Sequence, residues 1–299
     1  MDFKQIEAFV NVVRYESFSR AADATFFTQP TISAHISTLE NELGMKLLNR
    51  KGRTVEMTIQ GKEFYRYAVE MLNMRASALQ ALSKKTDNAD GILEVETSSI
   101  PAITLIPEMM NGFHEKHEKT QFYVNVSDSQ TVIDNISERR GEIGFVGENI
   151  KTPGIEYTKL FSDRVVLILP KDMKTDEKEI TFKEMTSLPF IWRENGSATR
   201  KYFEKIAEKR GYDRTAFKVV ALLNDPDVII RSVEQGLGVS ILSEKTFEKM
   251  KRPGVKAVRI EGFNKKRDFY MAVLKDVTLS SAALAFKKYV IENVAEVMC

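Results

Sequence analysis

The spacing of apolar residues changes near Gly91, and this change constrains the fold more than any other feature of the sequence. Before Gly91, apolar residues recur at steps of three and four, which is the period of amphipathic helices. After it, short runs rich in Val, Ile and Phe alternate with helical patterns, as in α/β domains. We therefore expect a mostly helical N-terminal part followed by an α/β domain.

The composition limits the classes of protein that fit. The chain has 299 residues, room for about two domains. Its 44 Lys and Arg against 42 Asp and Glu leave a net charge of +2, which excludes a histone-like polycation. It has no run of 18 apolar residues and no apolar leader, so we expect a cytoplasmic protein without membrane contact. Its single cysteine, Cys299, excludes an internal disulfide framework and a cysteine-rich zinc site.

Two adjacent short helices are predicted within the first 44 residues. The first follows Ser17 and Ser19, and its small alanine side chains let another helix approach closely. The second begins near Pro30, carries an apolar stripe over residues 32–43 and ends at Gly44. Two such helices joined by a tight connection are the sequence outline of a helix-turn-helix.

The outward face of the second helix consists of small, mostly polar side chains. Residues 30–39 carry no formal charge, whereas ordinary solvated helix faces, the alternative interpretation, usually carry Glu and Lys. Such a face fits the major groove, about 12 Å wide, and can present donors and acceptors to base edges. The residues of this helix pair that we expect at DNA are Ser19, Arg20, Gln29, Pro30, Thr31, Ser33, Ala34, His35, Ser37 and Thr38.

Basic residues are concentrated in the next segment. Residues 44–66 contain six basic residues and two glutamates, a local surplus of four positive charges. Arg50, Lys51 and Arg53 surround the turn of a predicted β-hairpin, where they can contact phosphates without reading sequence. A solvated loop is the alternative for this turn alone. With the helix pair, the hairpin predicts a winged helix-turn-helix over residues 1–58 and double-stranded promoter DNA as its partner.

A long helix is predicted over residues 59–87, capped by Thr58 and about 40 Å long. Its apolar residues form a seam with alternating steps of three and four, interrupted by Arg75. Because a lone helix of this length needs a partner for its seam, we expect a homodimer or homotetramer; packing on its own chain is the alternative. The seam consists of Tyr65, Ala68, Leu72, Leu79 and Leu82.

Residues 91–299 carry repeated strand and helix patterns, which predict an α/β effector-binding domain with mostly parallel sheets. The alternation restarts near residue 165, so we expect two lobes with a cleft between them. Lobe I is expected to take residues 91–163 and 267–299, and lobe II residues 164–266.

Two loops of this domain carry anion-binding chemistry, each between a predicted strand and a predicted helix. Hydroxyl groups and free backbone N–H groups meet at a helix end in residues 97–100, and residues 195–200 repeat the arrangement with Arg200 as a counter-charge. Helix capping is the alternative for each loop. Facing each other, the loops would hold a small oxyanion or carboxylate. The residues expected at this effector are Thr97, Ser98, Ser99, Ile100, Ser129, Gly147, Ser197, Thr199 and Arg200.

The motifs of common enzyme classes are not found. His114 and His117 are three residues apart, not four as on a metalloprotease helix, and residues 236–240 are too short for a dinucleotide-binding fingerprint. We therefore predict no enzyme activity, no metal and no cofactor. A solute-binding module whose helical head serves only for oligomerisation is the alternative to a regulator.

The order and spacing of residues over nearly 60 N-terminal positions resemble the LysR-type transcriptional regulators. The match runs from Phe3 through Ser17–Ala22 and Thr28–Ser33 to Gly61, and the likeness covers essentially the whole chain. The resemblance implies a winged helix-turn-helix, a dimerising linker helix and a regulatory domain folded like type 2 periplasmic solute-binding proteins. It also implies an inducer bound between two subdomains, and assembly as dimers or tetramers.

Other features narrow this resemblance. Ala34, Ser37 and Thr38 stand where many relatives carry Arg or Gln, which changes the bases that are read. The segments Gly144–Gly147 and Arg193–Arg200 are similar to the branch of the family that controls sulfur or selenium metabolism.

Overall fold

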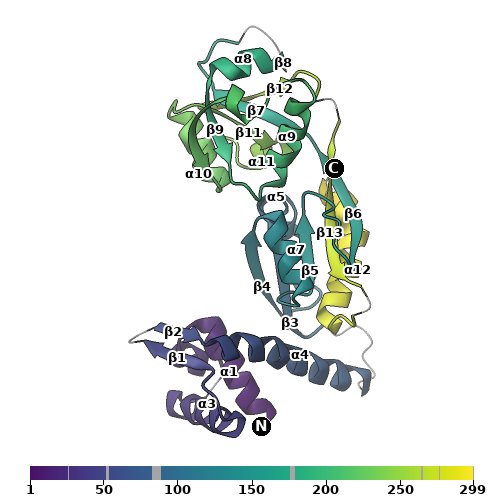
Figure 1. The fold of residues 1–299 in the computed structure, drawn as a ribbon. Coiled ribbons are helices and arrows are strands. Elements are labelled where there is room, and N and C mark those ends of the chain that lie inside the picture. The colour runs from purple at the N-terminus through teal and green to yellow at the C-terminus, as the bar shows by residue number, and fades with distance from the viewer. Residues whose placement is uncertain are drawn as a thin grey trace. The chain divides into compact units, whose positions relative to one another are not determined.

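The structure is a computed structural model that describes residues 1–25, 27–51, 54–82, 89–175, 179–263, 265–275 and 277–298. It divides into two compact units, Met1–Gly91 and Ile92–Cys299 (Figure 1). Each unit has its own hydrophobic core. Among the described residues, no helix is long and apolar enough to cross a membrane.

The first unit is a winged helix-turn-helix followed by a long helix, as predicted. Its elements are α1 (Phe3–Tyr15), α2 (Phe18–Thr25), α3 (Gln29–Leu43), β1 (Leu48–Lys51), β2 (Thr54–Met57) and α4 (Ile59–Leu82). The side chain of Thr28 caps α3, and Gly44 ends it with a φ of 67°, a left-handed conformation that favours glycine. The strands β1 and β2 pair antiparallel and form the wing.

The predicted apolar stripe of α3 faces the core of this unit. Ile32, Ile36 and Leu39 are buried, together with Ala21 and Ala22 of α2, whose small side chains let the helices pack closely. Where α4 starts, a Cβ atom added to Gly61 would lie 2.0 Å from the carbonyl oxygen of Leu47. Only glycine therefore lets α4 pass this close to the chain that enters the wing.

The seam of α4 is divided between two environments. Ala68 is buried in the core of the first unit, and Tyr65 and Leu72 pack against that core. The expectation that the whole seam needs another chain is therefore wrong for its first half, because α4 packs on α1. Farther along, Met74 and Leu79 are 65% and 56% exposed. Residues 83–87 of the predicted helix lie outside the described residues.

The second unit contains two sheets, and "lobe I" and "lobe II" below denote the parts built on them. The lobe I sheet has the order β4-β3-β5-β13-β6. Its strands are β3 (Gly91–Ser98), β4 (Thr120–Ser127), β5 (Ile143–Val146), β6 (Ile155–Asp163) and β13 (Arg267–Leu274). The helices of this lobe are α5 (Ser99–Thr104), α6 (Ile106–His114), α7 (Ser129–Ser137) and α12 (Ser281–Met298).

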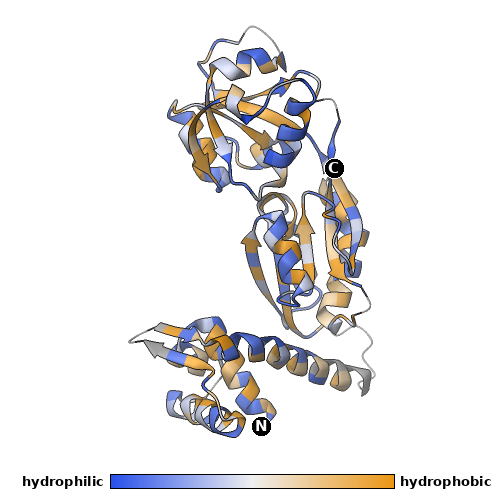
Figure 2. Ribbon diagram, in the orientation of Figure 1, coloured by the Kyte–Doolittle hydropathy of each residue, from blue (hydrophilic) through white to orange (hydrophobic). Residues whose placement is uncertain are grey.

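The lobe II sheet has the order β10-β9-β11-β7-β12-β8. Its strands are β7 (Val165–Pro170), β8 (Glu179–Ile180), β9 (Pro189–Arg193), β10 (Lys218–Leu223), β11 (Val239–Ser243) and β12 (Val255–Ile260). Its helices are α8 (Phe182–Ser187), α9 (Ala198–Glu208), α10 (Pro226–Glu234) and α11 (Glu244–Lys249), with a 3-10 turn at Arg214–Ala216. The strands of both sheets are predominantly hydrophobic (Figure 2), and Trp192 belongs to the aromatic core of lobe II.

The prediction of mostly parallel sheets is wrong, because both sheets are mixed. β3 pairs parallel with β5, and β9 pairs parallel with β10 and β11. β13 is antiparallel to β5 and β6, and β7 is antiparallel to β11 and β12. The reversals accompany two passages of the chain between the lobes, from β6 directly into β7 and from β12 into β13.

Candidate DNA-binding face and ligand cleft

The outward face of α3 is open to solvent. Gln29, Pro30, Ala34 and Thr38 are exposed; Thr31, Ser33, His35 and Ser37 are half-buried, and none of these eight side chains lies in the core. Ser19 and Arg20 are exposed on α2. Arg50 and Lys51 lie on β1, whereas Arg53 lies outside the described residues.

Local contacts hold this face in a regular helical shape. The Thr28 hydroxyl accepts a hydrogen bond from the Thr31 backbone N–H at 3.3 Å. The Thr38 hydroxyl donates to the carbonyl of Ala34 at 2.9 Å, and the His35 ring packs edge-on against Phe27. The face therefore presents mostly short, uncharged side chains on a rigid helix, as insertion into a groove requires.

Buried Glu40 ties the end of α3 to the wing. Its carboxylate pairs with Lys46 at 2.6 Å and accepts the backbone N–H groups of Leu47 at 2.9 Å and Leu48 at 3.2 Å. Burial opposes ionisation of this carboxyl, but these partners together hold its pKa below the usual range. One charged side chain thus connects the end of α3 to the start of the wing.

In the second unit, a small cavity lies where the two lobes meet. Its volume is about 10 Å³, close to what a single water molecule needs. The predicted effector residues that line it are Ser98, Ser99, Ile100, Ser129, Gly147, Ser197 and Thr199. The two predicted loops, far apart in the sequence, therefore do meet across one cavity.

Two predicted effector residues do not line the cavity. The Thr97 side chain is buried, and its hydroxyl donates to the carbonyl of Ser98 at 3.1 Å. Arg200 turns away from it: its guanidinium pairs with Glu204 at 2.8 Å and donates to Asn195 Oδ1 at 2.6 Å. The prediction that Arg200 supplies the counter-charge is therefore wrong, because its donors are used to hold the loop before α9.

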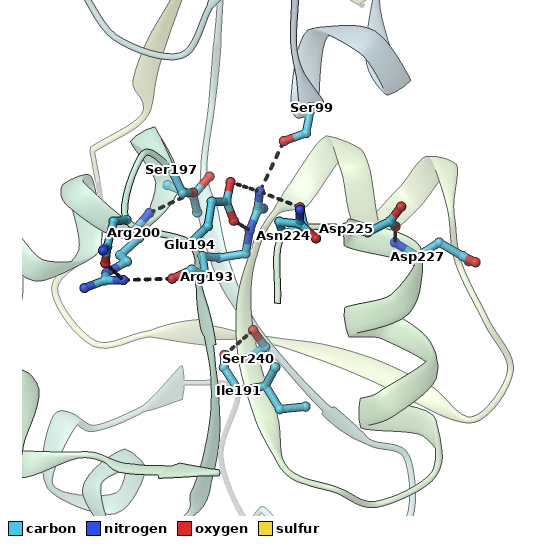
Figure 3. Close-up of polar contacts among 12 residues, drawn as sticks. Ser99, Ile191, Arg193, Glu194, Ser197, Arg200, Asn224, Asp225, Asp227 and Ser240 are labelled. Atoms are coloured by element: carbon cyan, nitrogen blue, oxygen red, sulfur yellow. Dashed lines mark hydrogen bonds and ion pairs between the residues drawn. The ribbon is translucent and has the colours of Figure 1, made fainter. Parts of the chain in front are cut away.

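The positive charges that line the cavity belong instead to Arg193 and Arg267, which were not predicted from the sequence. Arg193 ends β9 and is 1% exposed, and Arg267 begins β13 and is 5% exposed. Figure 3 shows the Arg193 guanidinium directed toward Ser99, on the other side of its strand from Arg200. A signal was present in the sequence, since each is a basic residue at the end of an apolar strand.

Arg193 is held from both lobes. It forms two hydrogen bonds of 3.0 Å with the carboxylate of Glu194. Its Nη2 also donates to the hydroxyl of Ser99 in lobe I at 3.2 Å and to the carbonyl of Asn224 at 3.3 Å (Figure 3). Its Nη1 has no partner among the described residues. One donor of a buried cation is thus left for a ligand.

Arg267 has fewer partners. Its Nη2 donates to the Thr199 hydroxyl at 3.0 Å, and its guanidinium lies 4.6 Å from the centre of the Phe269 ring. Its Nε and Nη1 have no partner among the described residues. Burial lowers the pKa of Arg267 to about 10, and the charge of Arg193 adds to this while Asp163 opposes it. At neutral pH the group remains a buried cation.

The hydroxyl groups around the cavity differ in whether they already form hydrogen bonds within the protein. Ser197 caps α9 by accepting the backbone N–H of Arg200 at 3.4 Å, and Ser129 accepts the N–H of Gly147 at 3.3 Å. Ser98 occupies the cap position of α5 but forms no capping hydrogen bond. The capping interpretation therefore holds for Ser197 and fails for Ser98.

Two acidic residues also line the cavity. Asp128 turns its carboxylate to its own helix, where it accepts the N–H groups of Gln130 at 2.9 Å and Thr131 at 3.1 Å. Glu194 is paired with Arg193, as described above. Both negative charges are therefore already engaged, and Arg267 forms no ion pair with a described carboxylate.

The lobes are closed tightly around the cavity. A Cβ atom added to Gly196 in lobe II would lie 2.3 Å from the carboxylate carbon of Asp128 in lobe I. Lys201 of α9 pairs with Glu148 at 3.2 Å, and Lys249 of α11 pairs with Glu108 of α6. A ligand much larger than a water molecule would therefore need the lobes to move apart at this point.

The two passages of the chain between the lobes lie beside the cavity. Asp163 ends β6 and is the register partner of Arg267 at the start of β13. Asp163 accepts hydrogen bonds from the Ser243 hydroxyl and from the backbone N–H groups of Arg164 and Lys245. A ligand on Arg267 would thus contact one of the two connecting strands directly.

A winged helix-turn-helix followed by a two-lobed α/β domain with a cation-lined cleft defines a ligand-responsive DNA-binding protein. Residues 3–62 match the model of the bacterial regulatory helix-turn-helix proteins of the LysR family, and residues 86–295 match the LysR substrate binding domain. The chain therefore belongs to the LysR family of transcriptional regulators.

Named relatives are themselves regulators. An uncharacterized HTH-type transcriptional regulator of Methanocaldococcus jannaschii is 29% identical, over 95% of this chain and 96% of its own. The RuBisCO operon transcriptional regulator of Allochromatium vinosum is 24% identical, over 100% of this chain and 98% of its own. The regulator CitR of Bacillus subtilis is 27% identical, over 83% and 84%. These relatives give no support to the predicted sulfur or selenium branch.

Solved structures share the fold at lower identity. Full-length CbnR complexed with its target DNA is 18% identical, with a TM-score of 0.68 over 98% of this chain and 99% of that one. The Synechocystis CcmR regulatory domain in complex with 2-PG is 21% identical, with a TM-score of 0.63 over 69% of this chain and 98% of that one.

Proposed function

We propose that this LysR-family regulator reads promoter DNA with the outward face of α3 and responds to a small anion held at Arg193 and Arg267. The proposed anion site is supported by these two buried guanidinium groups. Both line one cavity between the lobes, and both have N–H donors without a partner among the described residues. Buried donors without partners are rare and unfavourable, so a ligand that accepts their hydrogen bonds is expected.

The proposal that α3 reads promoter DNA rests on the shape and charge of this helix. On its outward face the exposed residues Gln29, Ala34 and Thr38 are uncharged, and the basic residues of the wing follow α3 in the sequence. We further propose that the chain acts as a homodimer or homotetramer in the cytoplasm, and that it performs no catalysis. The exposed second half of α4, with Met74 and Leu79, supports contact with another copy.

A pair of substitutions at Ala34 tests the DNA-reading face. Ala34 is exposed on a helix, so Glu and Gln are both accommodated there without loss of folding. Ala34→Glu brings a negative charge to the phosphates and should weaken binding to the promoter upstream of the gene by about a hundredfold, whereas Ala34→Gln changes only the base contacts. Equal affinity of Ala34→Glu and wild type, measured by fluorescence anisotropy, would exclude α3 from the interface.

A further inference from the structure

The two arginines of the cleft differ in which partners, a negative charge or hydrogen-bond acceptors, they lack. Arg193 is already neutralised by the Glu194 carboxylate at 3.0 Å, and in the described part of the chain only its Nη1 lacks a partner. Arg267 pairs with no carboxylate of the described residues, and both its Nε and its Nη1 lack partners. Arg267 therefore requires a negative charge, whereas Arg193 requires only an oxygen that accepts a hydrogen bond.

A third free donor lies in the same cavity. Ser98 lines it, and its hydroxyl does not cap α5, the helix that follows. Ser99, beside it, already accepts a hydrogen bond from Arg193 at 3.2 Å. The donors left for a ligand thus come from β3 and β13 in lobe I and from β9 in lobe II. A ligand that satisfies all of them must offer oxygen atoms in at least two directions.

The space available limits the size of that ligand. The cavity of about 10 Å³ and the approach of Gly196 to Asp128 leave room for a few atoms only after a small separation of the lobes. Most of the residues that line the cavity are polar or charged. The apolar side chains among them are those of Ile100, Ala198 and Phe269, so the cavity offers few apolar contacts. A short, oxygen-rich molecule therefore fits better than one with an aliphatic or aromatic body.

We propose that the ligand is a short bifunctional acid, with an ionised carboxylate on Arg267 and a second oxygen-bearing group on Arg193 Nη1 and the Ser98 hydroxyl. This inference rests on the proposed function, because it names the ligand class of the same cleft. It assigns separate tasks to the two arginines: Arg267 provides the charge that every ligand needs, and Arg193 selects for the second group.

A series of acids that differ only in the second group tests this division. Acetate, glycolate, malonate and 2-phosphoglycolate share a CH2–carboxylate unit and carry hydrogen, hydroxyl, carboxylate and phosphate, respectively, at the other end. Sulfate and inorganic phosphate serve as probes without a carboxylate. Binding is followed by the fluorescence of Trp192, the single tryptophan of the chain and the residue preceding Arg193, at constant ionic strength.

Three variants of the full chain complete the experiment. Arg267→Gln should weaken every probe about tenfold or more, because each needs the charge. Arg193→Gln combined with Glu194→Gln, so that no unpaired carboxylate is left in the cavity, should leave acetate nearly unchanged. It should remove the advantage of the best bifunctional acid, which in the wild type should be at least about tenfold over acetate. Arg231→Gln, on the exposed face of α10, should behave as wild type. Circular dichroism and melting curves establish that each variant is folded.

Contrary results would overturn either the proposed ligand class or the proposed role of Arg193. Acetate or sulfate binding as tightly as the best bifunctional acid would overturn the ligand class, and so would the absence of any response to all four acids. The double variant weakening acetate and the best acid equally would show that Arg193 only supports the cleft. None of these results bears on DNA reading by α3, because that half of the proposed function is tested separately at Ala34.

Discussion

The guanidinium of Arg200 donates to the backbone carbonyl of Arg193 over 3.0 Å. Arg200, which the sequence suggested as the counter-charge, therefore supports the strand end that carries Arg193, the residue whose guanidinium lines the cavity (Figure 3). Arg200 also lies 5.6 Å from the centre of the Trp192 ring, so it connects α9 to the aromatic core of lobe II.

Replacing Arg200 should therefore lower stability without removing ligand discrimination. Arg200→Gln breaks the ion pair with Glu204 and leaves the carbonyl of Arg193 without its donor, at a cost of about 1–3 kcal/mol in the free energy of unfolding. Urea denaturation followed by Trp192 fluorescence measures this change, with Arg231→Gln as the exposed control. Loss of probe binding in a folded Arg200→Gln protein would return Arg200 to the ligand site.

The serines at the two helix starts should respond differently to alanine. Ser197→Ala removes a cap from α9 and should cost about 1 kcal/mol of stability. Ser98→Ala removes no capping hydrogen bond, so its melting temperature should stay near that of wild type while the best acid binds several-fold more weakly. Thermal melts with and without that acid measure both effects. The reverse pattern would contradict the assignment of Ser98 to the ligand.

Glu40 should hold the wing in a pH-dependent manner. Its depressed pKa means that it stabilises the fold above its unfolded value of 4.5 and that this contribution is lost as the pH falls through the folded pKa. Glu40→Gln should therefore speed hydrogen exchange of the Leu47 and Leu48 amides about tenfold or more near pH 7. The ratio of variant to wild-type exchange should approach one at acidic pH. A ratio of one near pH 7 would show that the ion pair contributes nothing.

Glu96 should have the opposite pH dependence. Burial raises the pKa of this carboxyl, which accepts hydrogen bonds from Asn125 at 2.9 Å and Asn135 at 2.8 Å. Because ionisation is easier in the unfolded chain, its contribution is present below pH 4.5 and lost as the pH rises through the folded pKa. Glu96→Gln should raise the melting temperature at pH 7 by about 2–4 °C, the shift expected for about 1 kcal/mol.

The matched control for this residue is Glu138→Gln, because Glu138 is an exposed glutamate that pairs with Arg140. It should leave the melting temperature unchanged at both pH values. A Glu96→Gln protein less stable than wild type at pH 7 would mean that the ionised carboxylate is the favoured form in the fold.

The helical half of the sequence was largely predictable because its signals are local. Thr28 at the start of α3, Gly44 at its end and the stripe that includes Ile32 and Leu39 all act within a few residues. The burial of Ala68 was not predictable in this way, because it depends on where α4 crosses α1. A seam of apolar residues shows that a partner is needed, not which chain provides it.

The loops that line the cleft could be predicted from the sequence, but the charged residues that line it could not. Ser98 and Ser197 follow or precede regular elements, so their loops could be located by pattern. Arg267 could not, because its position depends on β12 and β13, where the chain returns to lobe I after about a hundred residues in lobe II. Arg200 fitted the local pattern of a loop before a helix, whereas Arg193 and Arg267 lie at strand ends that only the fold brings together.

If an anion on Arg267 changes how the protein binds DNA, DNA affinity should differ with and without that anion. Labelled promoter DNA is titrated with wild type, Arg267→Gln and Arg231→Gln, in the presence and absence of the best-binding acid at constant ionic strength. The acid should shift the apparent Kd about fivefold or more for wild type and Arg231→Gln and not for Arg267→Gln. An equal shift in all three proteins, or a shift in none, would contradict this role of Arg267.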